Sequence, residues 1–199
     1  MNMHKDLKFI EQLNLWITPV WWGMTNLDNE AMYKKIKELE NTTDSVYLSN
    51  LGGFQSATDR FDMMTTDPVF QPLRNLILHV IEKELNFKAK KFEVDRMWCN
   101  VNTKDDFNMI HSHGQFQFSG AYYVKAPKDS GQIVFRDPRP AAITNEFVTS
   151  QFNGGEVYRI EPEERKLLIF PSYLDHMVMP SKSDDDRVSI SWNIKATDD

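Results

Sequence analysis

The chain contains a single cysteine, Cys99, in 199 residues. One cysteine excludes an internal disulfide and a cysteine-based zinc site, and it is typical of proteins in a reducing cytoplasm. The chain also lacks any apolar run near the ~20 residues of a membrane-spanning helix, and its polar, charged N-terminus is a poor signal peptide. We therefore expect a cytoplasmic protein that does not associate with membranes.

Positive charge is also scarce. Lysine and arginine number 23 against 29 aspartate and glutamate residues, which gives a net charge of -6. No basic stripe is visible, so we expect no nucleic-acid partner. The chain has no internal repeat or low-complexity linker, and its length and 41% hydrophobic content suit one domain with a substantial core. These features predict a single domain over residues 1–199.

The first half of the chain predicts two helices. Asp28 can cap the first, over residues 28–40, where apolar residues recur at near-helical spacing. The second is predicted over residues 67–85, with a proline in its first turn. The glycine pair between them, Gly52-Gly53, is interpreted as a turn rather than as part of a phosphate-binding loop.

From about residue 92 the period of the apolar residues changes to two, which predicts strands. The last strand is the clearest, because Val188, Ile190, Trp192 and Ile194 share one face and polar residues share the other. We expect the apolar face to pack on helices and the polar face to line a pocket. The predicted strands lie near residues 92–102, 116–125, 132–136, 156–160, 166–170, 174–179 and 187–194, and the β-prone stretch 13–22 adds an edge strand.

Two helices followed by many short strands predict a mainly β fold with flanking helices, arranged as a β-sandwich or open barrel. In this arrangement the helices, which extend to about residue 90, support the strands that follow.

Three histidines and an arginine carry the chemistry. His111 and His113 form a His-x-His pair, and on an extended segment both imidazoles face the same side. His176 arrives from another strand and can complete a three-point metal site. Arg187 and Ser189 share a face, and a forked cation beside a hydroxyl suits a dicarboxylate that also chelates the metal. The pattern points to a non-haem iron enzyme that uses 2-oxoglutarate.

Each of these residues alone has an ordinary explanation. A lone His-x-His pair is usually found in a surface loop, and a lone histidine such as His176 is more often a core residue than a ligand. The combined pattern is far more specific than its parts. The two other histidines, His4 and His79, have no comparable neighbours in the sequence.

From Trp16 to Asn193 the chain resembles small 2-oxoglutarate/Fe(II)-dependent oxygenases related to prolyl 4-hydroxylases, a type found in phages and marine bacteria. The resemblance implies a double-stranded β-helix (jelly-roll) core over residues 92–195. The later segments are the specific ones. The matching segments are 18–21, 49–56, 98–102, His111-Ser112-His113, 119–124, 135–139, 170–176 and 187–193.

The resemblance also implies roles for individual residues. His111 and His176 fall on the two histidine ligands of iron, and Arg187 falls on the basic residue that binds the distal carboxylate of 2-oxoglutarate. Tyr123 falls where a tyrosine often contacts 2-oxoglutarate. His113 falls where most such oxygenases have an aspartate, so the third metal ligand here is expected to be an imidazole.

This departure matters because the usual centre combines two histidines with one carboxylate. A third neutral imidazole leaves the metal site more positive, which can slow oxygen activation or favour another metal. Asp105, Asp106 and Asp175 are alternative carboxylate ligands. No catalytic residue is expected beyond the metal centre and the residues that bind 2-oxoglutarate.

The sequence thus predicts an Fe(II)- and 2-oxoglutarate-dependent dioxygenase that hydroxylates a small molecule or a peptide and releases succinate and CO2. The alternative is a metal-binding, cupin-like jelly-roll protein without oxygenase activity. Cupins carry a glutamate shortly after their His-x-His pair, whereas this chain has Gln115, Phe116 and Gln117. The substrate, the native metal and the oligomeric state stay open.

Overall fold

The computed structural model describes residues 15–58, 63–139, 144, 147, 150–151 and 155–197. Its strands form two antiparallel sheets. The larger sheet has the order β1 (Trp21–Met24), β9 (Lys166–Pro171), β6 (Phe118–Lys125), β11 (Arg187–Thr197), β4 (Lys91–Asn102) and β3 (Phe54–Gln55). The smaller sheet has the order β2 (Asn50–Leu51), β5 (Phe107–His111), β10 (His176–Val178), β7 (Ile133–Arg136) and β8 (Val157–Ile160).

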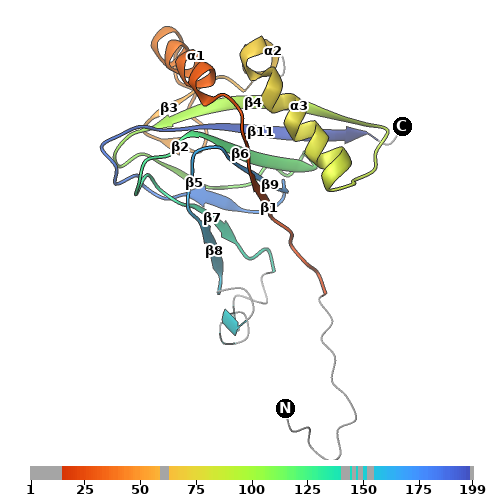
Figure 1. The fold of residues 1–199 in the computed structure, drawn as a ribbon. Coiled ribbons are helices and arrows are strands. Elements are labelled where there is room, and N and C mark those ends of the chain that lie inside the picture. The colour runs from red at the N-terminus through yellow and green to blue at the C-terminus, as the bar shows by residue number, and fades with distance from the viewer. Residues whose placement is uncertain are drawn as a thin grey trace, which may run out of the picture.

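Three α-helices cover the outer face of the larger sheet (Figure 1). They are α1 (Asn29–Thr42), the short α2 (Met63–Thr66) and α3 (Gln71–His79). A 3-10 turn, Pro68–Phe70, leads into α3, and a π-helical turn, Val80–Glu84, extends it. The Asp28 side chain accepts a hydrogen bond from the Glu30 backbone N–H at 2.9 Å, which confirms the predicted cap of the first helix.

The residues of strand β11 alternate between the two faces of the larger sheet. Its residues Val188, Ile190, Trp192 and Ile194 have no exposed surface and pack in the core between the sheet and the helices. Gly120 on β6 makes room for this packing, because a Cβ atom there would lie 2.0 Å from the Trp192 ring. The prediction that this face of the last strand packs on helices is therefore confirmed.

The other side of the larger sheet faces the smaller sheet. A second apolar cluster lies there, formed by residues of β6, β7 and β9 and by Leu174. Beside this cluster, the alternate polar residues of β11 line a cavity. The members of the second cluster are Tyr123, Ile133, Phe135, Leu168, Phe170 and Leu174.

The predicted fold class is confirmed: strands β4 to β11 are distributed over the two facing sheets and form the jelly-roll core, with helices on the outside. Some local predictions were incomplete. Strand β5 and helix α2 were not predicted, and the strand expected over residues 174–179 is shorter. The edge strand expected within 13–22 lies at Trp21–Met24, and its predicted first two residues are outside the described part.

The predicted glycine turn is also present. Gly52 and Gly53 connect β2 to β3 with φ angles of +74° and +64°, a conformation that glycine adopts without strain. No helix in the described part of the chain is both long and apolar enough to cross a membrane.

Candidate functional site

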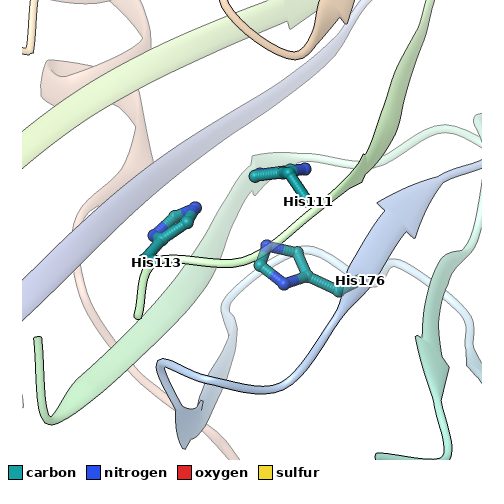
Figure 2. A group of neighbouring side chains, drawn as sticks. All are labelled: His111, His113 and His176. Carbon is teal, nitrogen blue, oxygen red and sulfur yellow. The ribbon is translucent and has the colours of Figure 1, made fainter. Parts of the chain in front are cut away.

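Adjacent strands of the smaller sheet bring two histidines together. His111 is the last residue of β5, His176 is the first residue of β10, and the two residues are paired directly across the strands. Their ring centroids are 4.4 Å apart. Figure 2 shows the imidazoles of His111, His113 and His176 turned toward a common centre. Three residues separated by up to 65 positions in sequence thus meet at one point.

His113 reaches this point in a different way from that predicted. Strand β5 ends at His111, so strand alternation does not govern His113, and the prediction of one extended segment for both was wrong in this respect. The backbone N–H of His113 instead donates to the Ser172 carbonyl at 2.8 Å, and its own carbonyl accepts from Phe116 N–H at 3.0 Å. These bonds hold the His113 ring 5.1 Å from the His111 ring.

Backbone carbonyls orient the rings of His111 and His176. Nδ1 of His111 lies 2.7 Å from the Met109 carbonyl oxygen, and Nδ1 of His176 lies 2.9 Å from that of Leu174. A carbonyl oxygen only accepts, so each Nδ1 must carry the proton and donate. The lone pair of each ring is therefore on Nε2, which is the arrangement of a metal-binding imidazole.

Polar side chains give His113 the same tautomer. Its Nδ1 lies 2.7 Å from the Asn193 side-chain oxygen. Ser119 also donates to this oxygen at 2.7 Å, and the Ser172 hydroxyl lies 2.8 Å from that of Ser119. The chain of bonds fixes Asn193 as an acceptor, so His113 donates through Nδ1 and presents Nε2 to the cavity.

The electrostatics of the cluster favour neutral imidazoles. Burial lowers the pKa of all three histidines, and in His176 burial and the neighbouring His111 lower the pKa to about 3. Neutral imidazole is the form that binds metals. One ligand atom from each of the three rings lies within 4.8 Å of the others, so the set suits a divalent transition metal.

Carboxylates do not take part in this cluster. Among the described residues the group that can hold a metal comprises His111, His113 and His176 alone. The Asp106 carboxylate accepts from the backbone N–H and hydroxyl of Thr103, at 2.7 and 2.9 Å. The proposed carboxylate alternatives therefore lie outside the cluster.

Arg187 is a buried cation at the other end of the cavity, with 2% of its surface exposed. Nη1 donates to the carbonyls of Ser130 and Gly131, at 2.9 and 2.8 Å, and Nη2 donates to the Asn102 side-chain oxygen at 2.8 Å. All three acceptors are neutral. In the described part of the chain no carboxylate lies within ion-pair distance of Arg187, and its buried Nε–H has no acceptor.

The unbalanced charge of Arg187 favours an anionic ligand. A guanidinium has five N–H donors, and three are used, so Nε–H and one N–H of Nη2 are available to a carboxylate. Burial lowers the pKa of Arg187, while Tyr123 and Asp106 oppose this shift, and the group stays protonated in any case. A buried charge without a counter-ion is costly, and a bound anion would remove that cost.

Two predicted residues lie beside Arg187. Ser189 and Tyr123 are paired across β11 and β6, and both line the cavity. Burial raises the pKa of Tyr123 to about 12, against the charge of Arg187, so its hydroxyl is a neutral donor. The cavity that connects this end to the histidines has a volume of about 450 Å³, within the range of small-molecule sites.

Sequence reasoning missed the residues that hold the site in place. Asn193 and Ser119 orient His113, and Asn102 orients Arg187. The alternation of β11 placed Asn193 on the polar face, which was the one available signal for it. The partners of Asn102 and Ser119 are 85 and 74 positions away, so no local pattern indicated their roles.

Comparison with known proteins agrees with this geometry. Residues 96–193, which include all three histidines and Arg187, match the model of a family described as putative 2OG-Fe(II) oxygenase. The chain belongs to the 2OG-Fe(II) oxygenase family. None of the curated protein sequences compared with it is significantly similar.

Solved structures share the fold at low sequence identity. A prolyl-4-hydroxylase from Pseudomonas putida has a TM-score of 0.60 and 14% identity, over 89% of this chain and 93% of that chain. A viral collagen prolyl hydroxylase from Paramecium Bursaria Chlorella virus-1, in complex with 2OG, has a TM-score of 0.61 and 12% identity, over 89% and 96%. HygX from Streptomyces hygroscopicus, with nickel and 2-oxoglutarate bound, has a TM-score of 0.62 and 11% identity, over 91% and 85%.

Proposed function

We propose that this 2OG-Fe(II) oxygenase holds Fe(II) through Nε2 of His111, His113 and His176, and binds 2-oxoglutarate through Arg187. One observation carries the proposal. A single cavity has three neutral imidazole lone pairs at one end and a buried guanidinium without a counter-ion at the other. A dicarboxylate that also chelates the metal would satisfy both ends at once.

The residues around the metal have a positioning role. The Met109 and Leu174 carbonyls and the Asn193 side chain keep each ring in the Nδ1–H tautomer, so that Nε2 faces the ion. When bound, Fe(II) would activate O2 while 2-oxoglutarate is decarboxylated, and the hydroxylation would follow from that chemistry.

The cosubstrate end would bind the distal carboxylate of 2-oxoglutarate. Arg187 offers Nε–H and one N–H of Nη2, and the hydroxyls of Tyr123 and Ser189 supply further donors beside it. The apolar side chains of Ile133 and Phe170 also line the cavity, with the Phe170 ring 4.8 Å from the His176 ring, and they would exclude water from the carbon chain of the ligand. That exclusion strengthens the charge-assisted hydrogen bonds of Arg187.

The overall reaction converts 2-oxoglutarate, O2 and a C–H bond of the substrate into succinate, CO2 and an alcohol. The substrate would be a small molecule or a peptide. Two relatives with the same fold are named as prolyl hydroxylases, and HygX has been solved with hygromycin B, nickel and 2-oxoglutarate together. Binding of 2-oxoglutarate and nickel by HygX also supports the assignment of cosubstrate and metal.

The three-histidine set is also compatible with a second function, that of a metal-binding jelly-roll protein without oxygenase activity. A carboxylate ligand stabilises the higher oxidation states of iron better than a neutral imidazole does. Because the described metal group has no carboxylate, substitution of His113 by aspartate tests the two alternatives against each other.

The test measures succinate formed from 2-oxoglutarate by wild type and His113→Asp, side by side, with Fe(II), ascorbate and O2. We expect wild-type turnover above background. We expect His113→Asp to keep metal binding and to match or exceed that turnover, since it restores the commoner ligand set.

Metal affinity is measured in parallel with Mn(II), which reports binding without turnover. His79→Ala is a suitable control, because the His79 ring is exposed and lies outside the metal group. A wild type that binds Mn(II) but forms no succinate, beside an active His113→Asp variant, would establish the non-catalytic alternative.

A further inference from the structure

The charged side chains that line the cavity are both arginines. Among the described lining residues, Arg96 and Arg187 are charged, and aspartate, glutamate and lysine are absent. This contrasts with the whole chain, in which acidic residues outnumber basic ones by 29 to 23. A concave site lined by one sign of charge attracts ligands of the opposite sign.

Arg96 lies far from Arg187. On β11 and β4 the register pairs Arg187 with Asn102 and Asn193 with Arg96. Six residues of extended strand separate the two pairs, which corresponds to ~20 Å. A five-carbon dicarboxylate bound at Arg187 is much shorter than this backbone separation, so Arg96 is left for a different group.

The side chain of Arg96 is held at the mouth of the cavity. Its guanidinium lies 5.5 Å from the centre of the Phe116 ring, a cation–π contact. Its Nε lies 3.5 Å from an Asp95 carboxylate oxygen, an ion pair that is too long for a good hydrogen bond. The side chain is 41% exposed, so the guanidinium is both oriented and accessible.

Arg96 is also close to the histidines. Its cross-strand partner Asn193 hydrogen-bonds His113, and Trp98, two residues further along the same strand, lies 5.5 Å from the His113 ring. A ligand anchored at Arg96 would therefore pass over Trp98 to reach the metal ligands. With 2-oxoglutarate at Arg187, the substrate would enter from this end of the cavity.

Asn100 adds a second recognition element on the same strand face. Its Nδ2 donates to the Ser191 hydroxyl at 3.3 Å, while its buried Oδ1 has no donor among the described residues. Because Asn100 lines the cavity, a ligand N–H or O–H that displaces the side chain slightly would satisfy this acceptor.

We propose that the substrate carries an anionic group, a carboxylate or a phosphate, that Arg96 binds, with an apolar part on Trp98 and Phe116 and an N–H or O–H donor toward Asn100. This inference rests on the proposed function, in which Arg187 takes 2-oxoglutarate. Arg96 is then a specificity-determining residue, and it discriminates acids from their neutral analogues by charge-assisted hydrogen bonds.

The test compares N-acetyl-L-leucine with its neutral analogue N-acetyl-L-leucinamide, and adds phenyl phosphate as an anion of the other kind. Affinities are measured by ligand-observed NMR on metal-free wild type, Arg96→Gln, Arg96→Lys and Arg187→Gln. Arg136→Gln is the control, because Arg136 lies outside the cavity and pairs with Glu156. Thermal unfolding of each variant verifies that it is folded.

We expect wild type to bind N-acetyl-L-leucine about tenfold more tightly than the amide. Arg96→Gln should lose this preference, Arg96→Lys should keep part of it, and the control Arg136→Gln should retain it. Tighter binding of phenyl phosphate than of N-acetyl-L-leucine would identify the anionic group of the substrate as a phosphate.

Equal affinity for acid and amide in wild type, absence of binding, or a preference that depends on Arg187 instead of Arg96 would overturn the proposal. Mn(II) binding and succinate formation test the proposed function separately, so the two failures are distinguishable.

Discussion

The two ends of the cavity treat charge in opposite ways. At one end Arg187 is a permanent cation with 2% of its surface exposed and neutral hydrogen-bond acceptors only. At the other end three titratable imidazoles are kept neutral by burial, each with its Nδ1–H bound to a neutral oxygen. The Arg187 end therefore favours an anionic ligand, and the histidine end favours a metal cation.

This difference shows where the free energy of ligand binding comes from. Burial destabilises an unpaired guanidinium, so a carboxylate that reaches Arg187 relieves a strain that the folded protein already carries. Burial has the reverse effect on the histidines, since it removes the proton that would compete with a metal. The same lack of water prepares both ends for ligands of opposite charge.

Loss of a histidine from the proposed metal site should have the largest effect, and that effect is on metal affinity. His176 is 6% exposed and its ring is central to the cluster, so His176→Ala should weaken Mn(II) binding by more than about 100-fold, beyond the effect typical of residues that only orient a ligand. Titration calorimetry measures the effect, and His79→Ala should behave as wild type. Unchanged Mn(II) affinity in His176→Ala would move the metal site elsewhere.

The arginine end should be nearly as sensitive. If Arg187 binds the distal carboxylate as proposed, Arg187→Ala should weaken 2-oxoglutarate binding roughly 30-fold, or by about 2 kcal/mol. Arg187→Lys keeps the charge but loses the planar fork, and should fall between wild type and Arg187→Ala. Calorimetry on the Mn(II) form gives all three affinities. Equal affinities of wild type and Arg187→Ala would contradict the assignment.

The orientation of His113 should have a smaller effect. Asn193→Ala removes the acceptor for Nδ1–H and should weaken metal binding by about 10-fold, at the lower end of the range for such partners. Asn193→Asp restores an acceptor and should recover the affinity. Ser191→Ala is the matched control on the same strand face, and the visible spectrum of bound Co(II) reports ligand geometry directly. A spectrum that is unchanged in Asn193→Ala would remove the positioning role.

The smallest effect concerns stability of the metal-free protein in mild acid. The pKa of His176 is lowered to about 3, so between pH 6.5 and pH 3 the unfolded chain binds a proton that the folded chain does not. Stability is therefore fully present above pH 6.5 and declines as the pH falls, by up to about 1.4 kcal/mol per pH unit for this histidine. Urea unfolding at pH 7.5, 6.5 and 5.5 measures the slope, and His176→Gln should reduce it. An equal slope in this variant would show that other groups are responsible.

Much of this architecture was visible in the sequence. The alternation of Val188, Ile190, Trp192 and Ile194 correctly separated the packed face of β11 from the face that lines the cavity. Asp28 was recognised as a helix cap from its place before an apolar repeat. Such patterns are readable because they depend on neighbours within a few residues, where the strand and helix periods act.

Strand β5 shows why other parts of the fold could not be predicted from the sequence. Its residues Asn108, Met109 and Ile110 mix polar and apolar types without a clear period, and the strand exists because β2 and β10 pair with it on either side. The position of His113 likewise depends on a bond to Ser172, 59 positions away.

The sequence by itself determined which chemical groups the protein has: three imidazoles, a forked cation, a tyrosine and the alternating strand that carries Arg187 and Ser189. The tertiary structure decided their state. It placed His176 opposite His111, gave His113 a neutral amide acceptor from Asn193, and buried Arg187 among neutral oxygens. The physical reason is that tautomers, pKa values and unpaired charges depend on burial and on hydrogen bonds between distant segments, and local patterning specifies neither.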